Sequence, residues 1–335
     1  MSVALFTLGG TIAMAGHSTD NGGVVARLTG AELTAAIPAL ADLGVPLDVR
    51  DAHAVPSANL TFAQVLEVVD AASRAVEAGV VGAVVTQGTD TLEETAFLVD
   101  LVWRHQEPLV VTGAMRNPTL AGADGPANLL AAARVAASPD ARGLGALVVF
   151  NDEIHAARWA RKTHSTSTAA FASPNAGPIG HVIEGRPRIL ARPDRREPFL
   201  QEFVTGPDAS ARLGMTRVAL HTATLDDDGA LLDGLEATHH GLVVAGLGVG
   251  HVSSDLAPVL GALSQRIPVV LTSRSGGGSV LRHTYGAIGS ETDLQRRGLV
   301  NGGLLDPYKA RVLLRLLVAN GAGRDEVAAA FGRLG

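Results

Sequence analysis

Residues 3–14 read VALFTLGGTIAM, and this stretch decides the fold more than any other in the chain. Residues 3–7 form an apolar, β-favouring run that is typical of a strand in a parallel sheet buried on both faces. The glycine pair at residues 9–10 lets the backbone turn sharply where the strand ends and approach a ligand closely. Thr11 is therefore expected at the carboxyl edge of the sheet, where α/β proteins bind ligands. On these residues alone, a simple strand-ending turn is an equally good interpretation.

The order of strand, polar turn and helix recurs along the first half of the chain. Further apolar strands are expected at residues 45–55, 80–85, 109–112 and 144–150, and a hairpin at 176–190. Thr29 with Glu32, and Thr61 with Gln64, have the spacing of capping boxes that open helices. This order predicts an α/β fold with a doubly wound, mostly parallel sheet. Its strand-end loops would bring residues near 11, 57, 89 and 114 together.

The second half predicts a smaller α/β domain. Strands are expected at 217–225, 241–247 and 267–272, and helices at 232–239, 253–263 and 308–319, with a further helix capped by the run at 289–294. The proline-containing, densely charged stretch between the halves is typical of a linker. We therefore predict a catalytic domain at 1–191, a linker at 192–212 and a C-terminal domain at 213–335.

Composition excludes several classes of function. The net charge of −6, without a basic block, argues against nucleic-acid binding, and no apolar run is long enough to span a membrane. The absence of Cys excludes thiol catalysis, and the eleven His include no His-x-x-x-His pair, so no metal site is expected. No export signal precedes the first strand, which favours a cytoplasmic protein, although a chain whose signal had been removed would look the same.

Two glycine-rich stretches suggest other ligands, and neither fits. Residues 246–250 follow a predicted strand, but their spacing is wrong for a dinucleotide-binding turn and the next strand ends without an acidic residue. Residues 273–279 could cradle an anion but lack the Lys of a phosphate-binding loop. No Gly-x-Ser-x-Gly elbow is present, which disfavours a conventional serine hydrolase. No cofactor is expected.

The remaining polar residues on predicted loops suit a threonine nucleophile. A Thr hydroxyl such as that of Thr11 or Thr89 must be activated by a base, which a partly neutral Lys can supply. Lys162 lies in the polar run 160–168, where a solvated surface cation is the simpler interpretation. Asp90 could orient that Lys or bind an ammonium group.

Six motifs in the same order resemble the signatures of bacterial-type L-asparaginases and the related glutaminase-asparaginases. They are LGGTIA at 8–13, QGTDTLEET at 87–95, GAMR at 113–116, ADGP at 123–126, Lys162-Thr163 and the segment 302–314. The resemblance covers nearly the whole chain, and the second motif is quite specific. It implies an amidohydrolase that acts on L-asparagine.

The resemblance also implies roles for single residues. Thr11 would attack the side-chain amide carbon in a double displacement through an acyl-enzyme, with Thr89, Asp90 and Lys162 as the second catalytic group. Ser57 would bind the substrate α-carboxylate and Asp90 its α-ammonium. Backbone groups near Gly10, Gly88, Thr89 and Ala114 would complete the substrate site and oxyanion hole. Which Thr attacks first is left open.

Family resemblance further implies a homotetramer, a dimer of dimers, with sites at the subunit interface. One alternative is the amidase subunit of a tRNA-dependent amidotransferase, which carries an added N-terminal domain that this chain, starting on its first strand, does not show. Another is a non-catalytic amino-acid-binding protein of the same fold. The presence of Thr11, Thr89, Asp90 and Lys162 together favours catalysis.

The sequence departs from the family pattern around the first Thr. Family members commonly carry a lid Tyr that bonds this Thr, but residues 15–30 contain none; Ala58 stands where Gln or Glu is usual, and His251 where Asn is usual. We hypothesise that Tyr285 reaches from a partner subunit toward Thr11 and replaces the missing hydroxyl. Packing within its own loop is the alternative for Tyr285. The lost polar contacts should disfavour the longer glutamine.

Overall fold

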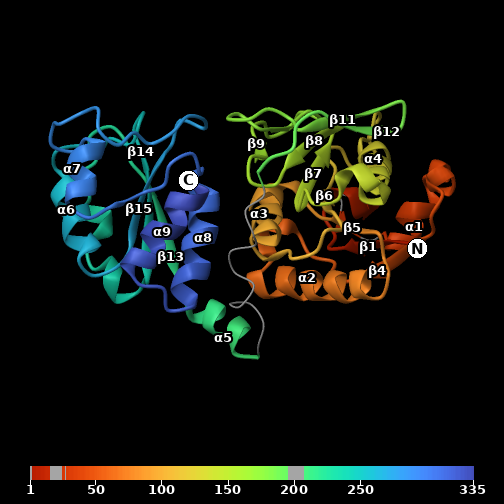
Figure 1. Ribbon diagram of the computed structural model, residues 1–335, viewed down its shortest axis with the longest axis horizontal. Helices are drawn as coiled ribbons and strands as arrows, with labels where there is room; N and C mark the ends of the chain where they lie inside the picture. The colour runs from red at the N-terminus through yellow and green to blue at the C-terminus, as the bar shows by residue number, and fades with distance from the viewer. Residues whose placement is uncertain (1, 16–24, 27, 195–206) are drawn as a thin grey trace. The chain divides into compact units, whose positions relative to one another are not determined.

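The computed structural model describes residues 2–15, 25–26, 28–194 and 207–335, and the chain divides into two compact units, Met1–Gln201 and Glu202–Gly335 (Figure 1). The division falls within the stretch 192–212. Residues 195–206 of that stretch lie outside the described residues, and helix α5 (Pro207–Met215) begins inside it. The role of 192–212 as a linker therefore stays a prediction.

The first unit is built on an eight-stranded sheet with the order β12-β11-β8-β7-β6-β5-β1-β4. Its strands are β1 (Val3–Thr7), β4 (Leu47–Asp51), β5 (Gly82–Thr86), β6 (Leu109–Thr112), β7 (Ala146–Phe150), β8 (Glu153–Ala156), β11 (Gly180–Ile183) and β12 (Arg186–Ile189). The pairs from β4 to β7 are parallel, and β8, β11 and β12 add an antiparallel edge. The mostly parallel sheet and the hairpin predicted at 176–190 are confirmed.

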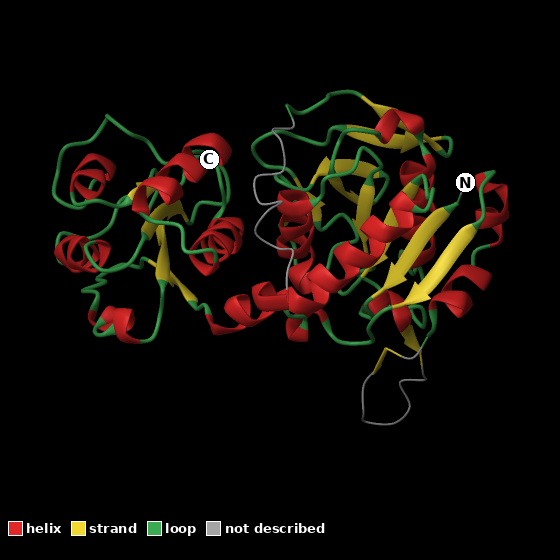
Figure 2. Cartoon of the chain, turned by 60° about the horizontal axis from the view of Figure 1, so that its bottom comes forward, coloured by secondary structure: helices red, strands yellow, loops and turns green. Residues whose placement is uncertain are grey.

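Four helices cover the two faces of this sheet: α1 (Gly30–Ala35), α2 (Phe62–Glu77), α3 (Leu92–Val102) and α4 (Gly125–Ala137). Val3, Leu5 and Val84 pack with Leu33 of α1 and Leu129 of α4 in one core cluster. Helix α2 contacts β1 and β5, and α3 contacts β6 and β7. Figure 2 shows the strands enclosed by these helices. Helices on both faces make the sheet doubly wound, as the alternation of strand and helix predicts.

Both predicted capping boxes are present. The Thr29 hydroxyl accepts the Glu32 N–H while the Glu32 carboxylate accepts the Thr29 N–H, and Thr61 and Gln64 repeat this arrangement. These bonds satisfy N–H groups that a helix start leaves unpaired.

Two pairs of very short strands complete the first unit. Strand β2 (Met14–Ala15) pairs with β3 (Val25–Ala26), and β9 (Arg161–Lys162) pairs with β10 (Phe171–Ala172). Most of the predicted loop 15–30 lies outside the described residues.

The second unit contains a four-stranded parallel sheet with the order β13-β14-β15-β16, again between helices (Figure 1). Its elements are β13 (Val218–Thr222), β14 (Gly241–Gly246), α6 (Leu256–Ser264), β15 (Val269–Ser273), α7 (Glu291–Arg296), β16 (Val300–Asn301), α8 (Pro307–Ala319) and α9 (Arg324–Leu334). Asp306 caps α8 by accepting the N–H groups of Tyr308 and Lys309. The smaller C-terminal α/β fold is thereby confirmed.

The helix predicted at 232–239 is wrong. The structure has two single 3-10 turns instead, Ala230–Leu232 and Leu235–Ala237. Gly229 and Gly234 precede these turns in the left-handed region, with φ of 80° and 71°, and such residues interrupt an α-helix. Among the described residues, no helix is long and apolar enough to cross a membrane.

Candidate active site

The glycine turn after β1 is pressed against the turn after β5. Gly9 and Gly10 have φ of 92° and 88°, and the Leu8 N–H donates to the Thr86 carbonyl at 2.8 Å. A Cβ on Gly10 would lie only 2.1 Å from the backbone nitrogen of Gly88, so no other residue fits there. This close approach brings the start of the short 3-10 helix Thr11–Ala13 beside the Gly88 turn.

Ser57, which follows strand β4 in the chain, lies beside the Gly88 turn. It opens a 3-10 helix, Ser57–Asn59, and its side chain is buried. Its Oγ accepts the Asp90 N–H at 3.3 Å, and its carbonyl accepts the Thr91 hydroxyl at 3.0 Å. A Cβ on Gly88 would lie 2.7 Å from Ser57 Oγ. Ser57, the predicted ligand of the substrate carboxylate, therefore packs directly against the turn that contains Thr89 and Asp90.

Lys162 reaches this turn from strand β9. Its Nζ donates to Thr89 Oγ1 at 2.9 Å and to Asp90 Oδ1 at 2.7 Å. The Lys162 side chain is only 15% exposed and Thr89 is buried, whereas the Asp90 side chain is 72% exposed. A base within this distance of a hydroxyl has the geometry of an activated nucleophile. The exposed face of the Asp90 carboxylate can in addition take a cationic ligand group.

Glu93 holds the backbone of Lys162, and sequence reasoning gave it no role of its own. The Lys162 N–H donates to Glu93 Oε2 at 3.0 Å, and Lys162 pairs with Phe171 in the β9–β10 ladder. Glu93 is buried in the first turn of α3, where a carboxylate is stabilised by the helix dipole. An acidic residue in a polar turn that leads into a helix, in a motif otherwise rich in Thr, is the signal that could have indicated it.

Ala114 closes another side of the site. It follows β6 and is 1% exposed. A Cβ on Gly113 would lie 2.5 Å from the Gln87 carbonyl, and one on Gly125 would lie 2.9 Å from Ile12 and 3.4 Å from the Ala114 side chain. Small residues at these positions let three turns meet, as the strand order predicts.

Asp124 and Asn128 fix the chain around Ala114; the sequence motif at 123–126 contains Asp124, but sequence reasoning gave neither residue a role. The Asp124 carboxylate accepts the N–H groups of Met115 at 3.0 Å and Arg116 at 2.8 Å. Asn128 donates to the Gly113 carbonyl at 3.0 Å and to Asp124 at 3.2 Å. These bonds leave the loop after β6 little freedom. Within the described ranges, no group of three or more His, Asp or Glu side chains could hold a metal ion.

Tyr285 lies in the second unit. The residue is 49% exposed, and its ring packs edge-on against His251, with ring centres 5.0 Å apart and an interplanar angle of 86°. The first unit thus brings together the predicted residues Thr11, Gly10, Ser57, Gly88, Thr89, Asp90, Ala114 and Lys162. The hypothesis for Tyr285 concerns a different copy of the chain and stays a prediction.

The chain is similar to known asparaginases over nearly its whole length. The L-asparaginase of Bacillus licheniformis is 34% identical over 95% of each chain. The glutaminase-asparaginase of Pseudomonas fluorescens biotype A is 34% identical over 93% of this chain and 84% of its own. The crystal structure of a probable cytoplasmic L-asparaginase from Campylobacter jejuni superposes with a TM-score of 0.84 and 28% identity, covering 98% of both chains.

Family models match both units of the chain. The N-terminal asparaginase model matches residues 2–195, and the glutaminase/asparaginase C-terminal domain model matches residues 217–331. The matched ranges contain every residue of the cluster around Thr11 and Lys162, as well as Tyr285. The chain therefore belongs to the asparaginase family.

Proposed function

We propose that this protein hydrolyses L-asparagine to L-aspartate and ammonia through a threonine acyl-enzyme. The observation that carries the proposal is the contact of Lys162 Nζ with both Thr89 Oγ1 and Asp90 Oδ1, at 2.9 and 2.7 Å. Thr89 and Asp90 lie on the turn against which the Gly10–Thr11 turn is pressed, and Lys162 reaches this turn from strand β9. Family membership supports the same reaction.

In the proposed first step, the Thr11 oxygen attacks the side-chain amide carbon. The carbon–nitrogen bond breaks, the Thr11 proton is delivered to the leaving nitrogen, and ammonia departs from an aspartyl ester. In the second step, a water molecule adds its oxygen to the ester carbon and returns a proton to Thr11. Lys162 in its neutral form takes a proton from Thr89 or from this water, and Asp90 stabilises the resulting ammonium.

The remaining residues bind and orient the substrate. Ser57, whose hydroxyl faces the Gly88 turn, takes the α-carboxylate, and the exposed Asp90 carboxylate takes the α-ammonium. Backbone N–H groups near Thr11, Thr89 and Ala114 stabilise the negative charge that develops on the amide oxygen. Tyr285 of a partner subunit would supply the hydroxyl that the segment 15–30 lacks, within a homotetramer.

Release of ammonia from asparagine and glutamine tests the proposal. We expect turnover of asparagine and slower turnover of glutamine. Thr11→Val should abolish turnover and prevent trapping of an aspartyl adduct, whereas Thr89→Val should slow turnover while an adduct on Thr11 still forms. An adduct on Thr89 would reverse these two roles. Binding of asparagine without ammonia release would instead favour a non-catalytic amino-acid-binding protein.

We also propose that the protein acts in the cytoplasm, as the probable cytoplasmic L-asparaginase from Campylobacter jejuni, with which it shares its fold, is described to do. Activity in the soluble fraction of gently lysed cells, and its absence from material released by osmotic shock, would support this location.

A further inference from the structure

An exposed loop in the second unit is hydrogen-bonded to a buried carboxylate, that of Glu291. Residues 282–288 are exposed, whereas Glu291, the first residue of α7, is 0% exposed. Glu291 Oε1 accepts the N–H groups of Thr284 and Tyr285, both at 2.8 Å. A carboxylate is tolerated inside a protein only when such donors surround it, so Glu291 and these two peptide groups depend on one another.

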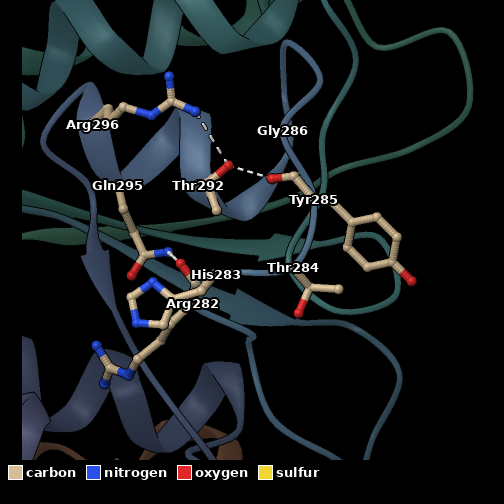
Figure 3. A pocket seen from close by; sticks show the side chains of 8 residues that line it. All are labelled: Arg282, His283, Thr284, Tyr285, Gly286, Thr292, Gln295 and Arg296. Atoms are coloured by element: carbon tan, nitrogen blue, oxygen red, sulfur yellow. Dashed lines mark hydrogen bonds between the residues drawn. The ribbon is translucent and has the colours of Figure 1, made fainter.

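The other side of the Tyr285 backbone is held as well. Its carbonyl accepts the Ser290 hydroxyl at 2.8 Å and also the Thr292 hydroxyl. Figure 3 shows this carbonyl directed toward Thr292 while the Tyr285 ring points away from helix α7. With both its N–H and its carbonyl bonded, the backbone of Tyr285 is held in one orientation.

His251 links the Glu291 carboxylate to the Tyr285 ring. Its Nε2 donates to Glu291 Oε2 at 3.1 Å, and its imidazole packs edge-on against the Tyr285 ring. Burial raises the pKa of Glu291, but the N–H groups of Tyr285 and Thr284 and the His251 ring outweigh burial and hold that pKa below its usual range. Glu291 is therefore ionised at neutral pH and accepts all three bonds.

The hydrogen bonds around Glu291 hold the Tyr285 backbone but do not involve the Tyr285 hydroxyl. In the part of the chain that the structure describes, the Tyr285 phenol oxygen makes no hydrogen bond, and the residue is 49% exposed. The loop and α7 border a depression of about 610 Å³, lined by Arg282, His283, Thr284, Tyr285, Gly286, Thr292, Gln295 and Arg296 (Figure 3). The bonds around Tyr285 thus fix an open-facing side chain, not one that fills a core.

We propose that Glu291 is a positioning residue for the hydrolysis. Its buried carboxylate, assisted by His251, orients Tyr285 so that the phenol hydroxyl can hydrogen-bond Thr11 of a neighbouring subunit. This inference rests on the proposed function. According to this inference, the Tyr285 loop of the second unit supplies the hydroxyl that a lid Tyr provides in other family members. Glu291 holds the backbone of this loop in place without substrate.

The test combines kinetics with spectra of the two tyrosines, Tyr285 and Tyr308. In full-length protein labelled with ¹³C-tyrosine, Tyr308→Phe assigns the Tyr285 signal. Glu291→Ala should shift and broaden that signal and lower kcat by roughly tenfold or more, toward the roughly 100-fold loss expected for Tyr285→Phe. Glu291→Gln keeps the volume and one acceptor oxygen, so it should fold even if the alanine variant does not, and should show an intermediate effect.

A matched control lies in the same helix. Asp293 is also largely buried and accepts the N–H of Gly289 and the Arg297 guanidinium, but its carboxylate accepts no hydrogen bond from Tyr285. Asp293→Asn should leave the Tyr285 signal and kcat unchanged. In a Tyr285→Phe background, Glu291→Gln should cause no further loss of kcat, because the two residues act as one unit.

The outcomes separate the two proposals. An inactive wild-type protein would overturn the proposed function, and the spectra would still show whether Glu291 holds the ring. An active protein with an unmoved Tyr285 signal in both Glu291 variants would overturn only the positioning role. The same loss of kcat with and without the Tyr285 hydroxyl would also overturn it, since that pattern reflects structural damage.

Discussion

Lys162 Nζ lies 2.9 Å from Thr89 Oγ1, although 73 positions separate the two residues in the chain. The same nitrogen lies 2.7 Å from Asp90, and the Lys162 backbone is held by buried Glu93. A flexible surface Lys would lose side-chain entropy on being held in this way. In the first unit, hydrogen bonds instead hold both the backbone N–H and the side-chain Nζ of Lys162, as a group that transfers protons requires.

Replacing Lys162 should remove catalysis without unfolding the protein. We expect both Lys162→Met and Lys162→Arg to lower kcat by roughly 100- to 10,000-fold, the range for loss of a positioned acid or base. Arginine keeps the charge but stays protonated, so it cannot accept a proton. Arg161→Met is the control, because neighbouring side chains on a strand point to opposite faces. Near-normal kcat for Lys162→Arg would rule out the role of Lys162 as a base.

Gly10→Ala should be far more damaging than alanine at a glycine with a similar backbone. A Cβ on Gly10 would meet the Gly88 backbone at 2.1 Å, whereas Gly44, with φ of 77°, has no atom within 4 Å of such a Cβ. Gly44→Ala should therefore cost only the left-handed strain of about 1–2 kcal/mol. Gly10→Ala should cost more and abolish ammonia release. Equal losses in thermal unfolding and activity would show that the close approach is unimportant.

Removing Asp124 should loosen the proposed oxyanion hole. Asp124→Ala leaves the N–H groups of Met115 and Arg116 without their carboxylate, and hydrogen bonds to a charged group contribute about 1.5–3 kcal/mol each. We expect kcat/KM for asparagine to fall by at least about tenfold, a change that corresponds to about 1.4 kcal/mol. Asp140→Ala, an exposed acid outside the site, should leave kcat/KM unchanged. A fall in both variants would indicate general destabilisation.

Ala58→Gln should shift the substrate preference. Ala58 is exposed and directly follows Ser57, so a longer polar side chain there can reach the substrate α-amino group. We expect KM for asparagine to fall and the glutamine-to-asparagine ratio of kcat/KM to rise by roughly tenfold, since a hydrogen bond to a charged group is worth about 1.5–3 kcal/mol. The control is Ala31→Gln, at an exposed position of α1. An unchanged ratio would contradict the specificity assigned to position 58.

Asp227 should stabilise the second unit in a pH-dependent way. Its carboxylate lies 2.7 Å from His221 Nε2 and also accepts the N–H groups of Gly229 and Thr224. Burial raises the pKa of Asp227, but these hydrogen bonds outweigh burial and hold the pKa below its usual value. The stabilisation is therefore complete above the ordinary Asp pKa of about 3.9 and is lost as pH falls through the lower folded value.

Hydrogen exchange of residues 218–229 measures this effect. At pH 7, Asp227→Asn should lower the opening free energy by about 1–3 kcal/mol, the cost of weakening hydrogen bonds to a charged group. That difference should shrink as the pH is lowered below about 4. Asp228→Asn serves as the control, because the Asp228 carboxylate accepts the Ala230 N–H and not those of Gly229 and Thr224. A pH-independent difference would show that the charge of Asp227 is not responsible.

Where sequence reasoning failed, the reason lies in contacts that no local pattern records. The apolar spacing of residues 232–239 suits a helix, yet Gly234 inside this range adopts a left-handed conformation and is followed by only the single 3-10 turn Leu235–Ala237. Glu93 and Asp124 lie in quoted motifs but received no role, because their partners, Lys162 and the loop after β6, come from other elements. An isolated acidic residue looks the same in sequence whether solvent or a backbone N–H surrounds it.

The sequence by itself determined the strands, the helix caps and the glycine turns. Buried parallel strands need continuous apolar runs such as residues 3–7, and helix starts need a hydroxyl with an acid or amide three positions later, so both can be read locally. Only the tertiary structure decided that Lys162 would leave the solvent and meet Thr89 and Asp90. A two-residue strand has no stability of its own; its place is set by pairing with β10 and by the buried Glu93. The free energy that assembles the site therefore comes from contacts between distant segments.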